Sequence, residues 1–77
     1  MSTSEIRHKA AADALRLGIQ KLGYSRAMAS AVVNGHRPPS LRAALDIEDG
    51  IGVRARSWIT GDPVAEMWKL MTEPEAA

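Results

Sequence analysis

Side chains that could read a ligand gather in one short stretch of the chain, residues 25–34. At about 100° per residue, Arg26, Ser30 and Asn34 fall on one arc of a helix together with two alanines. Arginine can pair with guanine, asparagine with adenine, and an alanine methyl can contact the methyl of thymine, so this arc has the chemistry of base recognition in a DNA major groove. The candidate base-reading residues are Ser25, Arg26, Ala27, Ser30, Ala31 and Asn34.

The residues around this stretch predict where its helix begins and ends. Gly23 suits a tight turn, because glycine adopts positive φ without steric cost, and Ser25 can cap the first turn through its side-chain oxygen. Asn34-Gly35 predicts a left-handed stop. The opposite, apolar face of the helix consists of Met28, Ala29 and Val32.

Charge is distributed unevenly along the chain. Residues 1–45 hold seven Lys or Arg against two Asp or Glu, a net charge of +5, whereas residues 46–77 hold three against seven, a net charge of −4. The basic half contains the 25–34 stretch, as expected for a surface that faces phosphates, although a solvated face would hold the same charges. The candidate phosphate contacts are Arg16, Lys21, His36, Arg37 and Arg42.

Periodicity and capping signals predict an all-α domain of four to five helices, including a C-terminal helix, and no strands. Residues 4–12 and 14–22 form two helices, with Asp13 as a possible N-cap, or one long helix, since nothing breaks the alanine run before Asp13. Ser40 is expected to cap a helix over 40–50. Short and C-terminal helices are expected over 54–60 and 63–72, separated by Gly61-Asp62-Pro63.

Two groups of apolar residues compete for the interior of this small domain. The predicted core consists of Leu15, Ile19, Leu22, Val32, Leu41, Leu45, Ile51 and Trp58. A second stripe, on the 63–72 helix, consists of Val64, Met67, Trp68 and Met71. Such a stripe is more often core than interface, but the predicted core already fills the centre. We therefore expect a second copy of the chain to cover the stripe, which gives a homodimer.

The segment around Gly23 resembles the lambda-repressor-like, Cro-type helix-turn-helix family. The resemblance covers roughly residues 14–60 and also includes the Pro-Ser-Leu start of the next helix at residues 39–41. It implies a compact helical fold in which residues 25–34 form the recognition helix. The matching positions are Leu22, Gly23, Tyr24, Ser25, Ser30, Val32 and Gly35.

The chain departs from the family pattern at two places. The family usually has Ala four residues before the turn glycine and Val or Ile six after it, whereas this chain has Ile19 and Ala29. The two volumes are exchanged across one helix contact, and volume-conserving changes are tolerated better than one-sided ones. Gly18 is the second departure and costs about 1 kcal/mol relative to Ala inside a helix.

Composition excludes several other functions. The 77-residue chain has no cysteine, no membrane-length apolar run and no charged-then-apolar leader, so we expect a cytoplasmic, soluble module without disulfides or a thiolate metal site. No nucleophile with a nearby base and no phosphate-binding glycine loop can be assembled, so an enzyme is not expected. His8 and His36 lack partners at metal-ligand spacing, and no cofactor is expected.

These observations predict a sequence-specific, DNA-binding transcriptional repressor. Residues 1–60 would bind double-stranded DNA and residues 61–77 would form the dimerisation element, so the operator should be an inverted repeat with half-sites about 34 Å apart. The resemblance implies a regulator of the phage or mobile-element kind. Two alternatives stay open: an antitoxin that represses its operon and binds a toxin protein, and a protein-interaction adaptor that uses this fold without DNA.

Overall fold

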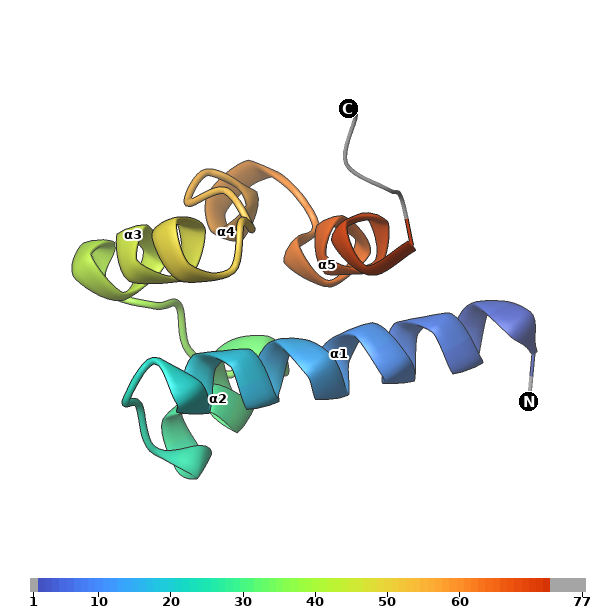
Figure 1. The fold of residues 1–77 in the computed structure, drawn as a ribbon, viewed down its shortest axis with the longest axis horizontal. Helices are drawn as coiled ribbons and strands as arrows, with labels where there is room; N and C mark the ends of the chain where they lie inside the picture. Colours follow the sequence, from blue (N-terminus) through green and yellow to red (C-terminus); the bar gives the residue numbers. More distant parts are fainter. Residues whose placement is uncertain (1, 73–77) are drawn as a thin grey trace.

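The computed structural model describes residues 2–72, which form five helices and no strand. The helices are α1 (Thr3–Lys21), α2 (Arg26–Val33), α3 (Leu41–Gly50), α4 (Ser57–Thr60) and α5 (Pro63–Thr72). Helix α1 runs along one side of the molecule, with α2 beneath its C-terminal end and α3, α4 and α5 on its other side (Figure 1). The expected all-α domain with a C-terminal helix is confirmed.

Helix α1 is continuous, so the single-helix alternative for residues 4–22 is correct. It begins at a reciprocal cap in which Ser2 accepts from the backbone N–H of Glu5 and the Glu5 carboxylate accepts from that of Ser2. Asp13 is therefore not an N-cap. Its carboxylate lies in mid-helix and pairs with Lys9 and Arg16 on the neighbouring turns.

The turn between α1 and α2 has the expected backbone. Gly23 has φ 107°, a conformation that side-chain-bearing residues rarely adopt, and the cap of α2 follows two residues later. Ile19 and Ala29 are both fully buried in one core cluster, which fits the exchange of volumes across the α1–α2 contact. Gly18 allows close packing, because a Cβ there would lie 2.8 Å from Cδ1 of Ile51.

Helix α3 buries a different face from the one that the sequence predicts. It faces the interior with Ala43, Ala44 and Ile47, whereas Leu41 and Leu45 are 75% and 50% exposed. After the end of α3, Val53 is also fully buried in the core. The expected core positions of Leu41, Leu45 and Leu22 were wrong, since Leu22 is also exposed. Buried or part-buried in the core, as expected, are Leu15, Ile19, Val32, Ile51 and Trp58.

Helix α5 packs along α1, and this contact uses much of the C-terminal apolar stripe (Figure 1). Val64 is 5% exposed and belongs to the core, so its assignment to a dimer interface is corrected. Met67 and Trp68 are half-buried against the same core, and the Arg7 guanidinium lies 5.8 Å from the centroid of the Trp68 ring. Met71 alone among the four is exposed.

Helix α4 is shorter than the expected 54–60 helix. Before Ser57 the chain turns more tightly, because the N–H groups of Ser57, Trp58 and Ile59 donate to carbonyls only three residues earlier. The free N–H of Arg54 donates to the Glu66 carboxylate and that of Ala55 donates to Glu48. Glu66 also accepts from the Arg54 guanidinium and from the Ser57 hydroxyl. Its carboxylate therefore ties α5 to α4 and to the segment that precedes α4.

Candidate nucleic-acid interface

One face of α2 is left free by the packing of the domain. Among the residues of α2, only Ala29 and Val32 are buried, and both point toward α1 and the core. Every candidate base-reading residue is exposed or half-buried, so none is lost to the interior. The free face combines small side chains with hydrogen-bonding ones, and small side chains let a helix backbone approach a groove closely.

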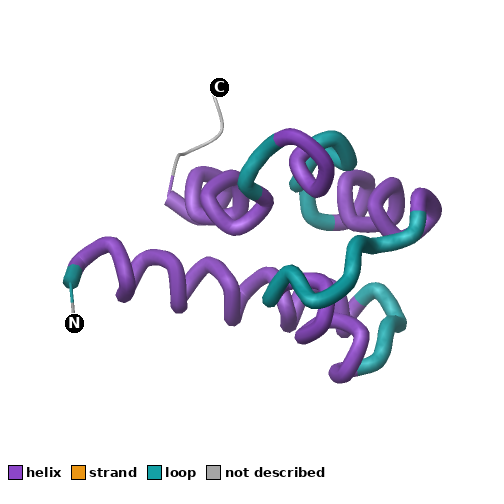
Figure 2. Tube along the Cα trace, turned by 180° about the vertical axis from the view of Figure 1, so that it is seen from behind, coloured by secondary structure: helices purple, strands orange, loops and turns teal. Residues whose placement is uncertain are grey.

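The two ends of α2 have the predicted caps. The Ser25 hydroxyl oxygen accepts from the backbone N–H of Met28 at 3.1 Å, which leaves its O–H free to donate to a ligand. At the other end Gly35 has φ 78°, and the N–H of His36 reaches back to the carbonyl of Ala31. The chain then leaves the helix through an exposed loop that contains His36 and Arg37 (Figure 2).

Basic side chains flank α2 at both ends. Lys21 ends α1 just before the turn, and Arg42 in the first turn of α3 lies close enough to Tyr24 to influence its phenol. His36 and Arg37 follow the other end of α2, and all four side chains are exposed.

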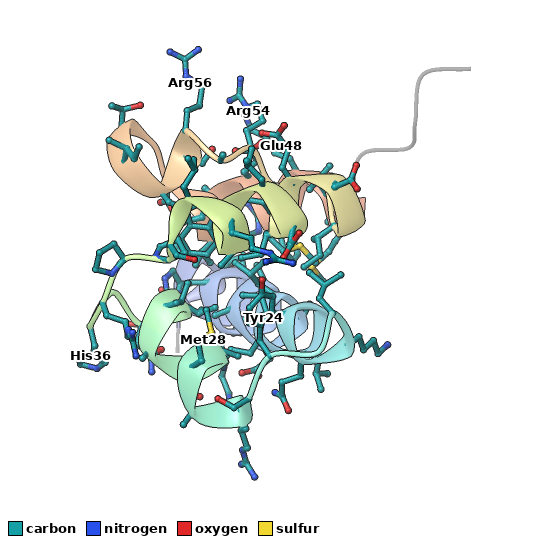
Figure 3. The ribbon with its side chains drawn as sticks, turned by 90° about the vertical axis from the view of Figure 1, so that its left-hand side faces the viewer. Tyr24, Met28, His36, Glu48, Arg54 and Arg56 are labelled. Atoms are coloured by element: carbon teal, nitrogen blue, oxygen red, sulfur yellow. The ribbon has the colours of Figure 1, made fainter. Side chains whose placement is uncertain are left out.

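Two other arginines lie far from this surface. Figure 3 shows Arg54 and Arg56 at the opposite end of the molecule from α2, whereas His36 lies beside its C-terminal end. Arg54 is also paired with Glu66 at 3.0 Å. The exposed basic residues near α2 are therefore spatially separate from Arg54 and Arg56.

Tyr24 connects the turn before α2 to α3. Its phenol donates a hydrogen bond to the carboxylate of Asp46, and this bond raises the pKa of the Tyr24 phenol. The contact holds the turn against α3 and so fixes the direction in which α2 leaves it. Sequence reasoning missed this pair, because 22 residues separate the partners and no local pattern links them.

Arg16 is the candidate phosphate contact whose surroundings differ most from expectation. Its Nη1 donates to Oδ1 of Asn34 at 3.0 Å, and its Nη2 donates to the carboxylate of Asp13. The hydrogen bond from Arg16 lowers the pKa of Asp13. The i, i+3 spacing of Asp13 and Arg16 was visible in the sequence, but the contact with Asn34 depends on how α2 crosses α1.

A shallow hollow of about 420 Å³ lies between α1 and the free face of α2. Polar groups from both helices line it, and the exposed side chain of Leu17 forms its apolar part. The residues that line the hollow are Asp13, Arg16, Leu17, Gln20, Arg26 and Ser30. Arg16, Arg26 and Ser30 thus share one recess, whereas Lys21, His36, Arg37 and Arg42 lie outside it.

Comparison with known protein families, with curated proteins and with solved structures finds no match to this chain. The geometry of the α2 surface therefore carries the functional argument. In the part of the chain from residue 2 to residue 72, no helix has both the length and the apolar character needed to cross a bilayer.

Proposed function

We propose that this protein is a sequence-specific DNA-binding repressor that inserts α2 into the major groove. The observation that carries the proposal is the free face of α2, on which Arg26, Ala27, Ser30 and Ala31 stand unburied between two basic ends. Small and hydrogen-bonding side chains on one helix face suit base edges, and the flanking cations suit the two phosphate backbones. A phage or mobile-element context and a cytoplasmic location belong to the same proposal.

The repressor would act as a homodimer on an inverted repeat. Because Val64 is buried within one chain, the surface left for the second copy is the outer side of α5, where Leu70 and Met71 are 46% and 45% exposed. Symmetric pairing of these helices would hold two copies of α2 at a fixed separation. Sedimentation at tens of micromolar tests the dimer: the wild-type chain should sediment as a dimer and Met71→Asp as a folded monomer. A monomeric wild type contradicts this part of the proposal.

Salt dependence tests the central claim. Three cationic phosphate contacts per subunit, from Lys21, Arg37 and Arg42, would give a dimer a slope of roughly −5 for log K against log salt, and a fourth from Arg16 would make it roughly −7. The measurement is a titration of DNA from the protein's own upstream region between low and physiological salt. Absence of binding at low salt, or a flat salt response, contradicts DNA binding.

A matched pair of arginines sharpens this test. Arg37→Ala should weaken binding to all duplexes and make the slope shallower by about one unit. Arg56→Ala removes the same charge from the end of the molecule opposite α2 and should leave binding nearly unchanged. Equal effects of the two substitutions would show that net charge, and not the α2 surface, drives the interaction.

An antitoxin that also represses its operon is the second candidate. It is favoured by large apolar side chains that residues 2–72 leave half-exposed or more, namely Leu41, Leu45 and Ile59, of which Ile59 is 84% exposed. Large exposed apolar side chains away from α2 suit a protein partner. Co-expression with the product of the adjacent gene, followed by size-exclusion chromatography, tests this candidate. A complex that Leu41→Asp and Ile59→Asp abolish would support it over a plain repressor.

A further inference from the structure

Arg16 is held between two partners on two helices. One guanidinium nitrogen donates to Asn34 at the end of α2, and the other donates to Asp13, one turn earlier on α1. Its side chain is 23% exposed, compared with 65% for Lys9, which pairs with the same carboxylate. The guanidinium is therefore fixed at both ends and is not a free cation on the surface.

This contact fixes the orientation of the Asn34 amide. A guanidinium can only donate hydrogen bonds, so the Asn34 atom next to it must be the carbonyl oxygen, and the direction of the NH₂ group follows. Reading adenine requires both groups, since the oxygen accepts from N6 and the NH₂ donates to N7. The carbonyl oxygen has two lone pairs, so the bond from Arg16 leaves one for a base.

Asn34 needs such support because of its position. It is the C-cap of α2, where the regular helix ends, and its side chain is exposed. An unsupported side chain there would populate several rotamers and flipped amides, and ordering it on binding would cost conformational entropy. A prearranged amide avoids that cost.

Asp13 makes Arg16 a poor partner for phosphate. The carboxylate, which also pairs with Lys9, offsets part of the guanidinium charge, and the pKa of Asp13 is lowered chiefly by the hydrogen bond from Arg16, so Asp13 is ionised near neutral pH. A DNA phosphate that approached Arg16 would also approach this negative charge. Coulomb repulsion between them opposes the contact.

We propose that Arg16 is a positioning residue that prearranges Asn34 for base reading, with Asp13 as its anchor, and that it makes no phosphate contact of its own. The proposal rests on the proposed function, because it assigns a role within the same DNA-binding surface. It predicts energetic coupling between residues 16 and 34 in sequence-specific binding only.

The main experiment is a double-mutant cycle on two DNAs. The specific duplex is one enriched by the wild-type chain from a randomised library, and the reference is its scrambled version. Arg16→Met keeps most of the aliphatic stem and should weaken the specific duplex about 10-fold, with the scrambled duplex and the salt slope unchanged. Asn34→Ala should lose a similar factor, and the double variant should lose no more than either single one.

Lys21→Met is the matched control, since it removes an exposed cation from the same helix. It should weaken both duplexes and make the salt slope shallower by about one unit. If Arg16→Met behaves as Lys21→Met does, Arg16 is a phosphate contact and the proposal fails. Independent losses for Arg16→Met and Asn34→Ala would overturn it equally.

Asp13→Asn gives a test in which the two interpretations predict different ratios of specific to scrambled affinity. By charge alone, loss of a carboxylate beside the DNA should strengthen binding to both duplexes. If Asp13 anchors Arg16, the ratio of specific to scrambled affinity should instead fall about three-fold or more, because Asn34 loses its support. A ratio that stays the same or rises contradicts the anchoring role.

A measurement without DNA separates failure of this inference from failure of the proposed function. In the free wild-type protein, the NMR signals of the Arg16 Nη hydrogens should show slowed rotation, and Asp13→Asn and Asn34→Ala should each restore the averaging seen for exposed Arg56. Averaged Arg16 signals in wild type would overturn the positioning role of Arg16 and leave the proposed function unaffected. If the contact is present but the wild-type chain enriches no sequence, the proposed function fails and the positioning role fails with it.

Discussion

Helices α2 and α5 pack on the same long helix α1, yet they leave different surfaces free. Helix α2 buries Ala29 and Val32 and packs half-buried Met28 and Val33 against the core, and its face of alanines and hydrogen-bonding residues stays free. Helix α5 buries Val64 and packs half-buried Met67 and Trp68 against the same core. The sequence predicted correctly that the polar face of α2 is free. It did not predict that the apolar face of α5 is largely buried within the same chain.

The continuity of α1 explains the difference. If residues 4–12 had folded back as a separate helix, they could have covered the apolar side of residues 14–22. In one continuous helix, Ala11 and Ala12 need other elements to cover them; both are buried in one core cluster with Val64 of α5, and α5 packs along α1. An apolar stripe that seems superfluous in the sequence thus becomes part of the core.

Charge at a buried α5 position should give the largest effect. Val64→Asp places a carboxylate among core residues and should lower the free energy of unfolding by at least about 3 kcal/mol. The free energy of unfolding of the whole domain is expected to be only about 4–12 kcal/mol. Thermal unfolding followed by circular dichroism measures the loss. Ala65→Asp, at the exposed neighbouring position of the same helix, should change stability by no more than about 0.5 kcal/mol, and equal losses would contradict the burial of Val64.

The α1–α2 contact should respond to volume. Ala29→Ile adds bulk at a fully buried position and should cost about 1–3 kcal/mol in the free energy of unfolding, whereas the same change at exposed Ala27 should cost little. Adding Ile19→Ala to Ala29→Ile exchanges the two side-chain volumes across the contact and keeps their sum nearly constant. The double variant should therefore be more stable than Ala29→Ile alone in urea unfolding. A simple sum of the two losses would show that these residues do not share one contact.

The free face of α2 should affect binding without affecting stability. Ser30→Ala removes a half-buried hydroxyl beside Arg26 and should cost about 1–3 kcal/mol on the specific duplex, with a much smaller loss on scrambled DNA. Fluorescence anisotropy on both duplexes measures this difference. An equal loss on both DNAs would mean that Ser30 does not face the bases.

The smallest expected effect is a pH dependence from the α4–α5 junction. Burial by itself would raise the pKa of Glu66, but hydrogen bonds from Ser57 and from the backbone and guanidinium of Arg54 outweigh it and lower the pKa. A lowered pKa in the folded state means that ionised Glu66 stabilises the fold above its unfolded pKa of about 4.3, and that this stabilisation is lost as the pH falls through the folded value.

Comparison of wild type with Glu66→Gln isolates this contribution from those of other carboxylates. The free energies of unfolding in urea should differ by about 1 kcal/mol at pH 7, with wild type the more stable, and the difference should shrink at pH 3. A difference that stays constant between these pH values would show that the ionised carboxylate is not the stabilising form. The result would leave the α2 surface untouched, since Glu66 lies in the C-terminal half.

Much of the fold follows from local signals that act over a few residues. Ser25, Ser40 and Asp62 cap helices where the sequence places them, because a cap needs only a side-chain oxygen near the next free N–H groups. Gly23 and Gly35 adopt positive φ, which glycine does without the steric cost that a Cβ would bring. The candidate face of α2 also follows from helical spacing alone. Its function in DNA binding stays a proposal.

What only the tertiary structure decided concerns contacts between segments distant along the chain. Leu41 and Leu45 have the apolar character of core residues, yet the rotation of α3 exposes them and buries Ala43 and Ile47. Arg16 has the charge of a phosphate contact, yet the crossing of α2 over α1 places it against Asn34. Periodicity determines which residues share a face of one helix, but the direction of that face depends on the packing of all helices together, and no local pattern encodes it.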